Sequence, residues 1–108
     1  MFKRSEYTVH EIVELLQAAN PPKLVDVREQ SEWDLVHLPQ SQLATQELVE
    51  EMLSQWPRDT HIVTICHHGV RSINAANYLQ SQGFSNVRSM RGGLDAWARE
   101  IDPTLPRY

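Results

Sequence analysis

The residues best suited to chemistry form one short stretch, Cys-His-His-Gly-Val-Arg-Ser at positions 66–72. Cys66 is the only cysteine in the chain and ends an apolar run, residues 61–66. Gly69 permits a tight backbone path after it. A loop of this kind can curl so that several N–H groups point inward and bind an anion. The stretch is therefore a candidate site built around a cysteine nucleophile.

The surroundings of Cys66 favour its thiolate form over the thiol. A helix is expected to begin near Ser72, and its amino-terminal end carries partial positive charge. Arg71 supplies a fixed cation beside it. Helix N-termini and neighbouring cations both favour a thiolate, which is the nucleophilic form of cysteine. The same features would hold an anionic substrate next to the sulfur.

Two other interpretations of Cys66 compete with this one. Free cysteines are often buried as small core residues. Cys66, His67 and His68 are also all metal-ligand types, but three consecutive residues rarely present three ligands to one ion. The other three histidines have no spacing that completes a set. The sequence favours a reactive cysteine, and we predict neither a metal nor a cofactor.

The elements that must position this loop alternate along the chain. Short apolar runs predict strands at 23–27, 61–66 and 86–90, and the stretch 37–41 is predicted as a loop. Amphipathic stretches predict helices at 8–19, 45–56, 72–82 and 92–100, with a short helical turn at 31–36. Alternating strands and helices indicate an α/β fold with a parallel sheet covered on both faces. Ligands of such sheets bind at the carboxyl ends of the strands, where Cys66 is placed.

Length and charge limit the remaining possibilities. A chain of 108 residues is expected to form a single domain over 1–108. A net charge of −4 argues against a nucleic-acid partner. No apolar stretch approaches the roughly 20 residues needed to cross a membrane, and the first residues lack the apolar segment of a secretion signal. One cysteine cannot form an internal disulfide, so we expect a reducing, cytoplasmic setting.

Four motifs, in the same order, resemble those of single-domain rhodaneses, the thiosulfate:cyanide-type sulfurtransferases. The resemblance extends from about Tyr7 to Trp97. It rests on LVDVRE (24–29), on Glu32 with HLP (37–39), on CHHGVRS (66–72) and on RGGLDAW (91–97). It implies a rhodanese-like α/β fold with a five-stranded parallel sheet and helices on both faces.

The resemblance also implies a mechanism. Cys66 would attack the outer sulfur of a small anionic donor such as thiosulfate and become a persulfide. Cyanide or a thiol acceptor would then remove the sulfur. Arg71 would orient the donor, and the persulfide would be cradled by the loop residues His67, His68, Gly69, Val70, Arg71 and Ser72. The alternative is a persulfide carrier or binding module that receives sulfur from a protein partner in a relay.

Details of two motifs refine the resemblance. Four residues separate Cys66 from Arg71, whereas related phosphatases and arsenate reductases have one more, so the loop is of sulfurtransferase size. The loop also differs from the mercaptopyruvate sulfurtransferase type, which favours a thiosulfate-like donor. In the segment 36–41, Val36 and Gln40 stand where the family has glycines. We therefore expect that turn to follow another path or to carry strain.

Overall fold

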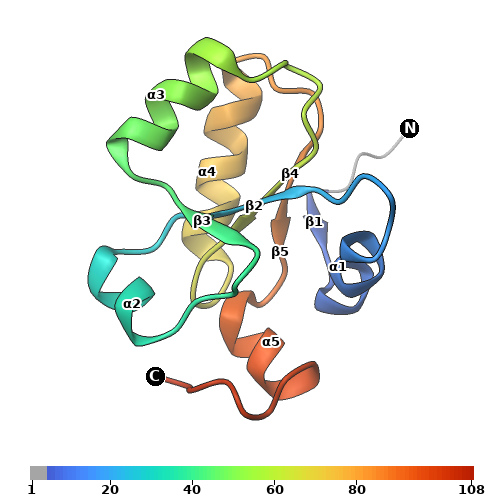
Figure 1. Cartoon of the computed structure of the whole chain (residues 1–108), viewed down its shortest axis with the longest axis vertical. Coiled ribbons are helices and arrows are strands. Elements are labelled where there is room, and N and C mark those ends of the chain that lie inside the picture. Colours follow the sequence, from blue (N-terminus) through green and yellow to red (C-terminus); the bar gives the residue numbers. More distant parts are fainter. Residues whose placement is uncertain (1–4) are drawn as a thin grey trace.

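A computed structural model describes residues 5–108 of the chain. Five strands of this part form one parallel sheet in the order β1-β5-β4-β2-β3 (Figure 1). The strands are β1 (Glu6–Tyr7), β2 (Lys23–Asp26), β3 (Ser41–Leu43), β4 (Ile62–Ile65) and β5 (Val87–Met90). The helices are α1 (Val9–Leu16), α2 (Gln30–Leu35), α3 (Gln46–Gln55), α4 (Val70–Ser81) and α5 (Gly93–Glu100). The five-stranded parallel sheet implied by the family resemblance is confirmed.

Helices cover both faces of the sheet, as predicted. Figure 1 shows α3 above the strands and α5 below them. One apolar core lies between the sheet and helices α1 and α5, and includes Ile12 and Trp97. The other lies between the sheet and helices α3 and α4, and includes Met52 and Leu79. β4 lies between β5 and β2, and all four of its residues are buried, as expected for a strand packed on both faces.

The predicted elements differ from the structure in three main respects. The strands β1 and β3 have two and three residues and lie at the sheet edges, too short to give a recognisable apolar run. α1 begins after Thr8, which forms a capping box with Glu11, but ends at Leu16, before residue 19. α4 begins at Val70, two residues before the predicted start at Ser72, because Gly69 takes a left-handed conformation and the backbone is helical directly after it.

The segment 36–41 follows another path and is not strained. Among residues 5–108, no residue other than glycine has a positive φ. Val36 is extended, and Ser41 turns the chain by donating from its backbone N–H and its hydroxyl to the carbonyl of Leu38, at 3.0 and 2.7 Å. The Arg28 guanidinium donates to the Val36 carbonyl at 2.6 Å. The turn without glycines is therefore held by hydrogen bonds.

No helix between residues 5 and 108 has the length and apolar character needed to span a bilayer. The prediction that the chain starts without a secretion signal falls in part on residues 1–4, which lie outside the described residues.

The start of α3 offers a simple test of the local structure. The Thr45 hydroxyl accepts a hydrogen bond from the Leu48 N–H at 3.1 Å and caps the helix. We expect Thr45→Ala to lower the free energy of unfolding by about 1 kcal/mol, because it leaves that N–H without its partner. Urea denaturation measures the loss. Thr45→Ser keeps the hydroxyl and should stay close to the unmodified protein, and equal losses in both variants would refute the capping role.

Candidate active site

Cys66 lies directly after β4, at the carboxyl end of the sheet, as predicted. Its side chain is buried, and the residue is 1% exposed. Four residues later the chain is already in helix α4. Burial alone would also fit the interpretation of Cys66 as a core residue, so the polar contacts of the sulfur distinguish the two.

Two backbone N–H groups donate hydrogen bonds to the Cys66 sulfur. The backbone N–H of Gly69 donates to Sγ at 3.0 Å, and that of Ser72 donates at 3.4 Å. The thiol itself donates to Ser72 Oγ at 3.3 Å, and that oxygen lies 2.6 Å from Ser89 Oγ on β5. Converging N–H groups stabilise negative charge on the atom that they face. This environment suits a reactive sulfur better than an inert core cysteine.

The loop reaches this shape because Gly69 has a φ of +95°. A side chain at this φ would be strained, and a Cβ there would lie 3.0 Å from the backbone N of Gly92. After Gly69 the chain enters α4, and the N–H of Ser72, in the first turn of that helix, faces the sulfur. The partial positive charge at this helix end adds to the stabilisation of an anion.

Helix α5 supports the loop from the other side. The N–H of Leu94 donates to the Cys66 carbonyl at 2.9 Å, and that of Asp95 donates to the His67 carbonyl at 3.1 Å. Gly93, with a φ of +64°, makes this approach possible, because a Cβ there would overlap both carbonyl oxygens. The loop backbone is therefore fixed by two helix N-termini.

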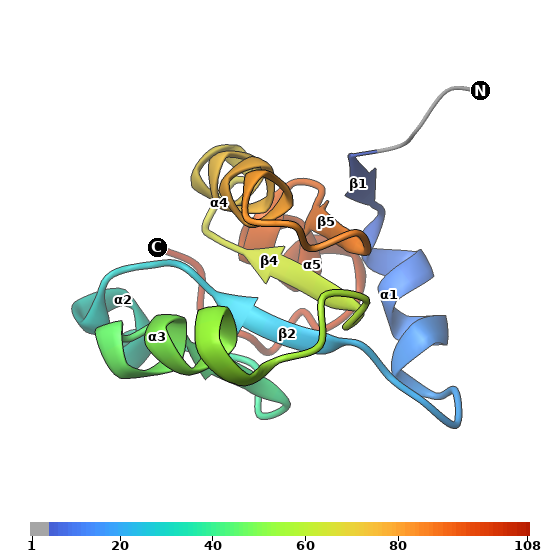
Figure 2. The same cartoon turned by 90° about the horizontal axis from the view of Figure 1, so that it is seen from above.

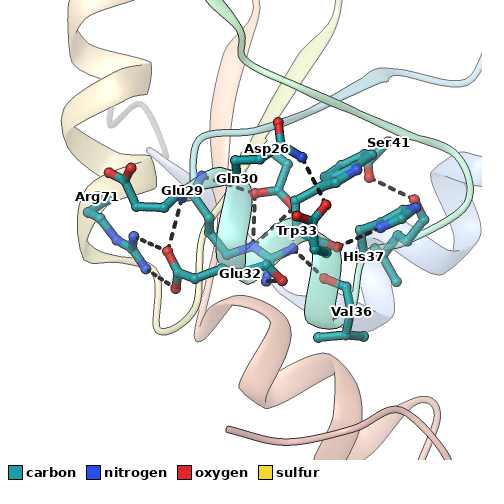
Figure 3. A network of polar contacts seen from close by, with 12 residues as sticks. Asp26, Glu29, Gln30, Glu32, Trp33, Val36, His37, Ser41 and Arg71 are labelled. Atoms are coloured by element: carbon teal, nitrogen blue, oxygen red, sulfur yellow. Dashed lines mark hydrogen bonds and ion pairs between the residues drawn. The ribbon is translucent and has the colours of Figure 1, made fainter.

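Arg71 is paired with a carboxylate of helix α2. Its Nη1 donates to Glu32 Oε1 at 2.7 Å and its Nη2 to Glu32 Oε2 at 2.9 Å, a two-pronged contact (Figure 3). The hydrogen bonds from Arg71 lower the pKa of Glu32 to about 2. The contact with Glu32 raises the pKa of Arg71. The guanidinium of Arg71 is therefore charged and is held by Glu32.

The two histidines of the loop differ. His67 stacks on the ring of Tyr108, with ring centroids 4.0 Å apart, and its buried Nδ1 has no hydrogen-bond partner. Burial lowers the pKa of His67, so the ring is neutral at neutral pH. His68 is exposed, and Val70 is 68% exposed. Of the residues predicted to bind substrate, Gly69 and Ser72 contact the sulfur, whereas the side chains of His68 and Val70 face solvent.

Several residues that build this site were not identified as its members from the sequence: Glu32, Ser89, Gly93 and Tyr108. Glu32 is 39 positions from Arg71. It entered the sequence analysis only as part of a family motif, as did Gly93. Nothing in the local sequence pattern indicates that Ser89 or Tyr108 lies near Cys66. Their contacts arise from the parallel sheet and from the path of the chain after α5.

Comparisons with known proteins agree with this geometry. The family model for the rhodanese-like domain matches residues 8–100. MoeZ of Mycobacterium tuberculosis, a probable adenylyltransferase/sulfurtransferase, is 35% identical over 98% of this chain, which spans only 28% of the length of MoeZ. The thiosulfate sulfurtransferase GlpE of Vibrio cholerae is 36% identical over 70% of this chain and 72% of its own length. A rhodanese-like domain protein from Staphylococcus aureus superposes with a TM-score of 0.77 at 25% identity, covering 96% of this chain and 98% of that one.

Proposed function

Because the chain belongs to the rhodanese family of domains, we propose that it transfers sulfane sulfur through a persulfide on Cys66. The observation that carries the proposal is the position of Cys66 Sγ at the start of α4, with the N–H groups of Gly69 and Ser72 directed at it. Relatives that are themselves sulfurtransferases support this class of reaction. Thiosulfate is the proposed donor, as the loop sequence indicates.

The reaction has two steps. The Cys66 thiolate attacks the outer sulfur of thiosulfate, and a new S–S bond forms as the bond to sulfite breaks and sulfite leaves with its electron pair. An acceptor such as cyanide or a thiol then attacks the terminal sulfur. With cyanide the product is thiocyanate, and the electron pair of the broken S–S bond returns to the Cys66 thiolate. This is covalent catalysis by an activated nucleophile.

The residues of the site have different roles in this reaction. The N–H groups of Gly69 and Ser72 hold negative charge on the sulfur and on the persulfide derived from it. Arg71 orients the anionic donor, and Glu32 holds the guanidinium in place. The side chains of His68 and Val70 are exposed, and the backbone contacts to the sulfur come from Gly69 and Ser72.

The role of Arg71 is tested by Arg71→Ala. We expect the KM for thiosulfate to rise about tenfold with a smaller change in kcat, because the variant removes a cation that faces an anionic donor. Steady-state thiocyanate formation measures both constants. Arg88→Ala is the matched control. It also removes an arginine, but one whose guanidinium lies over the ring of Tyr7 on β1. An unchanged KM in Arg71→Ala would show that this side chain does not bind the donor.

A second candidate function is a carrier that takes persulfide sulfur from a protein partner. One observation favours it: Glu32 compensates the charge of Arg71, which leaves less net positive charge to attract a free anionic donor. The relative MoeZ is a longer protein with a second named activity, which also fits a relay. Thiocyanate formation from thiosulfate and cyanide separates the two functions, because a dedicated carrier would turn over thiosulfate poorly. Hydrolysis of an aryl phosphate tests the phosphatase interpretation, and we expect none.

Two further properties are proposed from the sequence: the number of domains and the cellular compartment. We propose that residues 1–108 act as one domain and work in the cytoplasm, where a free reactive cysteine stays reduced.

A further inference from the structure

The segment that follows α5, residues 102–108, folds back toward the active-site loop. Figures 1 and 2 show it running from α5 toward α2. Two side-chain contacts ahead of Tyr108 attach it to the rest of the protein. Leu105 packs against the apolar core beneath α5, and Arg107 Nη2 lies 3.0 Å from Asp95 Oδ1 on α5. These two contacts, with the stiffness of Pro103 and Pro106, place Tyr108 at the site.

Tyr108 contacts three residues of the site at once. Its ring stacks on His67. Its hydroxyl accepts a hydrogen bond from Arg28 Nη1 at 2.8 Å and lies 2.9 Å from Glu32 Oε2, to which it donates. Burial raises the pKa of Tyr108, so the hydroxyl keeps the proton that it donates to Glu32.

The hydroxyl of Tyr108 is fixed because Arg28 is fixed. Arg28 forms a buried ion pair with Asp26, with Nη2 2.7 Å from Oδ2, and also donates to the Val36 carbonyl. Burial lowers the pKa of Arg28, but the hydrogen bonds to Asp26 and Tyr108 outweigh it, so the guanidinium stays charged. The buried pair of Asp26 and Arg28 is therefore connected to the site through Tyr108.

The two oxygens of Glu32 are held differently. Oε1 accepts from Arg71 and from the backbone N–H of Glu29 at 3.0 Å. Oε2 accepts from Arg71 and from Tyr108. Exposed ion pairs between long side chains are weakly ordered when nothing else holds them. The side chain of Arg71 is 45% exposed, so the place of its guanidinium depends on how firmly Glu32 is held.

We propose that Tyr108 is a positioning residue that, through Glu32, holds Arg71 where its charge favours an anionic reagent over a neutral one at Cys66. The inference rests on the role of Arg71 proposed above, and Tyr108 acts without touching the reagent. The effect depends on the hydroxyl of Tyr108. The stacking of its ring on His67 keeps this hydroxyl beside Glu32.

Alkylation of Cys66 tests the inference without sulfur transfer. The thiolate displaces iodide from iodoacetate, an anion, or from iodoacetamide, a neutral reagent of similar size. The ratio of the iodoacetate to the iodoacetamide rate constant measures the preference for an anion. The ratio in Arg71→Ala is the lower limit, because that variant lacks the cation. We expect Tyr108→Phe, which keeps the aromatic ring, to lower the ratio about fivefold, the effect of losing one hydrogen bond. The iodoacetamide constant alone should stay within about twofold.

Tyr78→Phe is the matched control, because Tyr78 is a half-exposed tyrosine on α4, and its ratio should not change. A ratio in Tyr108→Phe equal to that of the unmodified protein would overturn the inference. Equal acceleration of both reagents would also overturn it, since it would mean that Tyr108 only covers Cys66. An unchanged ratio in Arg71→Ala would also overturn the inference, because the charge of Arg71 would then not affect the reagents. Failure of the proposed function would be seen separately, as absence of a persulfide after treatment with a sulfur donor.

Discussion

Cys66→Ser is expected to abolish thiocyanate formation from thiosulfate and cyanide while leaving the fold intact. A serine hydroxyl is a far weaker nucleophile than a thiolate and cannot carry a persulfide. The loss should exceed about a thousandfold in kcat, as is usual when a covalent nucleophile is removed. Serine is nearly the same size as cysteine, so the buried site should accept it. Steady-state kinetics with both substrates measures the loss.

The control for this variant is a residue that touches the same sulfur. Ser72→Ala removes the hydroxyl 3.3 Å from Cys66 Sγ but keeps the backbone N–H that donates to it. We expect it to keep a measurable part of the activity. Thermal denaturation should show both variants folded. Turnover retained by Cys66→Ser would move the chemistry to another residue.

Gly93→Ala is expected to have the largest effect on stability. A Cβ at this φ of +64° would overlap the carbonyl oxygens of Cys66 and His67, and both are backbone atoms that cannot simply rotate away. The variant must shift α5 away from the loop and weaken the two hydrogen bonds from Leu94 and Asp95. We expect a loss of about 3 kcal/mol in the free energy of unfolding, with reduced activity, since strain and lost contacts add. Urea denaturation and the thiocyanate assay measure the two effects.

Gly83→Ala is the matched control for backbone strain alone. Gly83 also has a positive φ, +99°, but a Cβ there would lie 3.6 Å from the flexible side chain of Arg58. We expect it to cost about 1 kcal/mol without loss of activity, because only the left-handed conformation is disfavoured. Equal losses in the two variants would show that the close approach of α5 to the loop is unimportant.

The central part of the fold could be predicted because its signals are local. β4 is a continuous apolar run, and α1 begins with a capping box formed by Thr8 and Glu11. The edge strands β1 and β3 could not be recognised, since two or three residues make no pattern. The start of α4 was placed two residues late because Gly69 was interpreted as part of a loop, whereas its positive φ turns the chain directly into the helix.

Part of the candidate site could likewise be predicted from the sequence, and part could not. The sequence around Cys66 contains the nucleophile, the glycine and the arginine within a few residues, so their meeting could be predicted. The partner of Arg71 could not, because Glu32 reaches it through the pairing of distant strands and helices. Tyr108 is 80 positions from Arg28, and its contact depends on how the segment after α5 folds back. Local pattern carries no information about such distant contacts.

The measurement that tests the central claim most directly is the intact mass of the protein after brief incubation with thiosulfate, without reductant. Cys66→Ser is treated in parallel, and both samples are then exposed to cyanide. We predict that the unmodified protein gains the mass of one sulfur atom, that cyanide removes it, and that the variant gains nothing. An unchanged mass in the unmodified protein, or the same gain in Cys66→Ser, would contradict transfer of thiosulfate sulfur through a persulfide on Cys66.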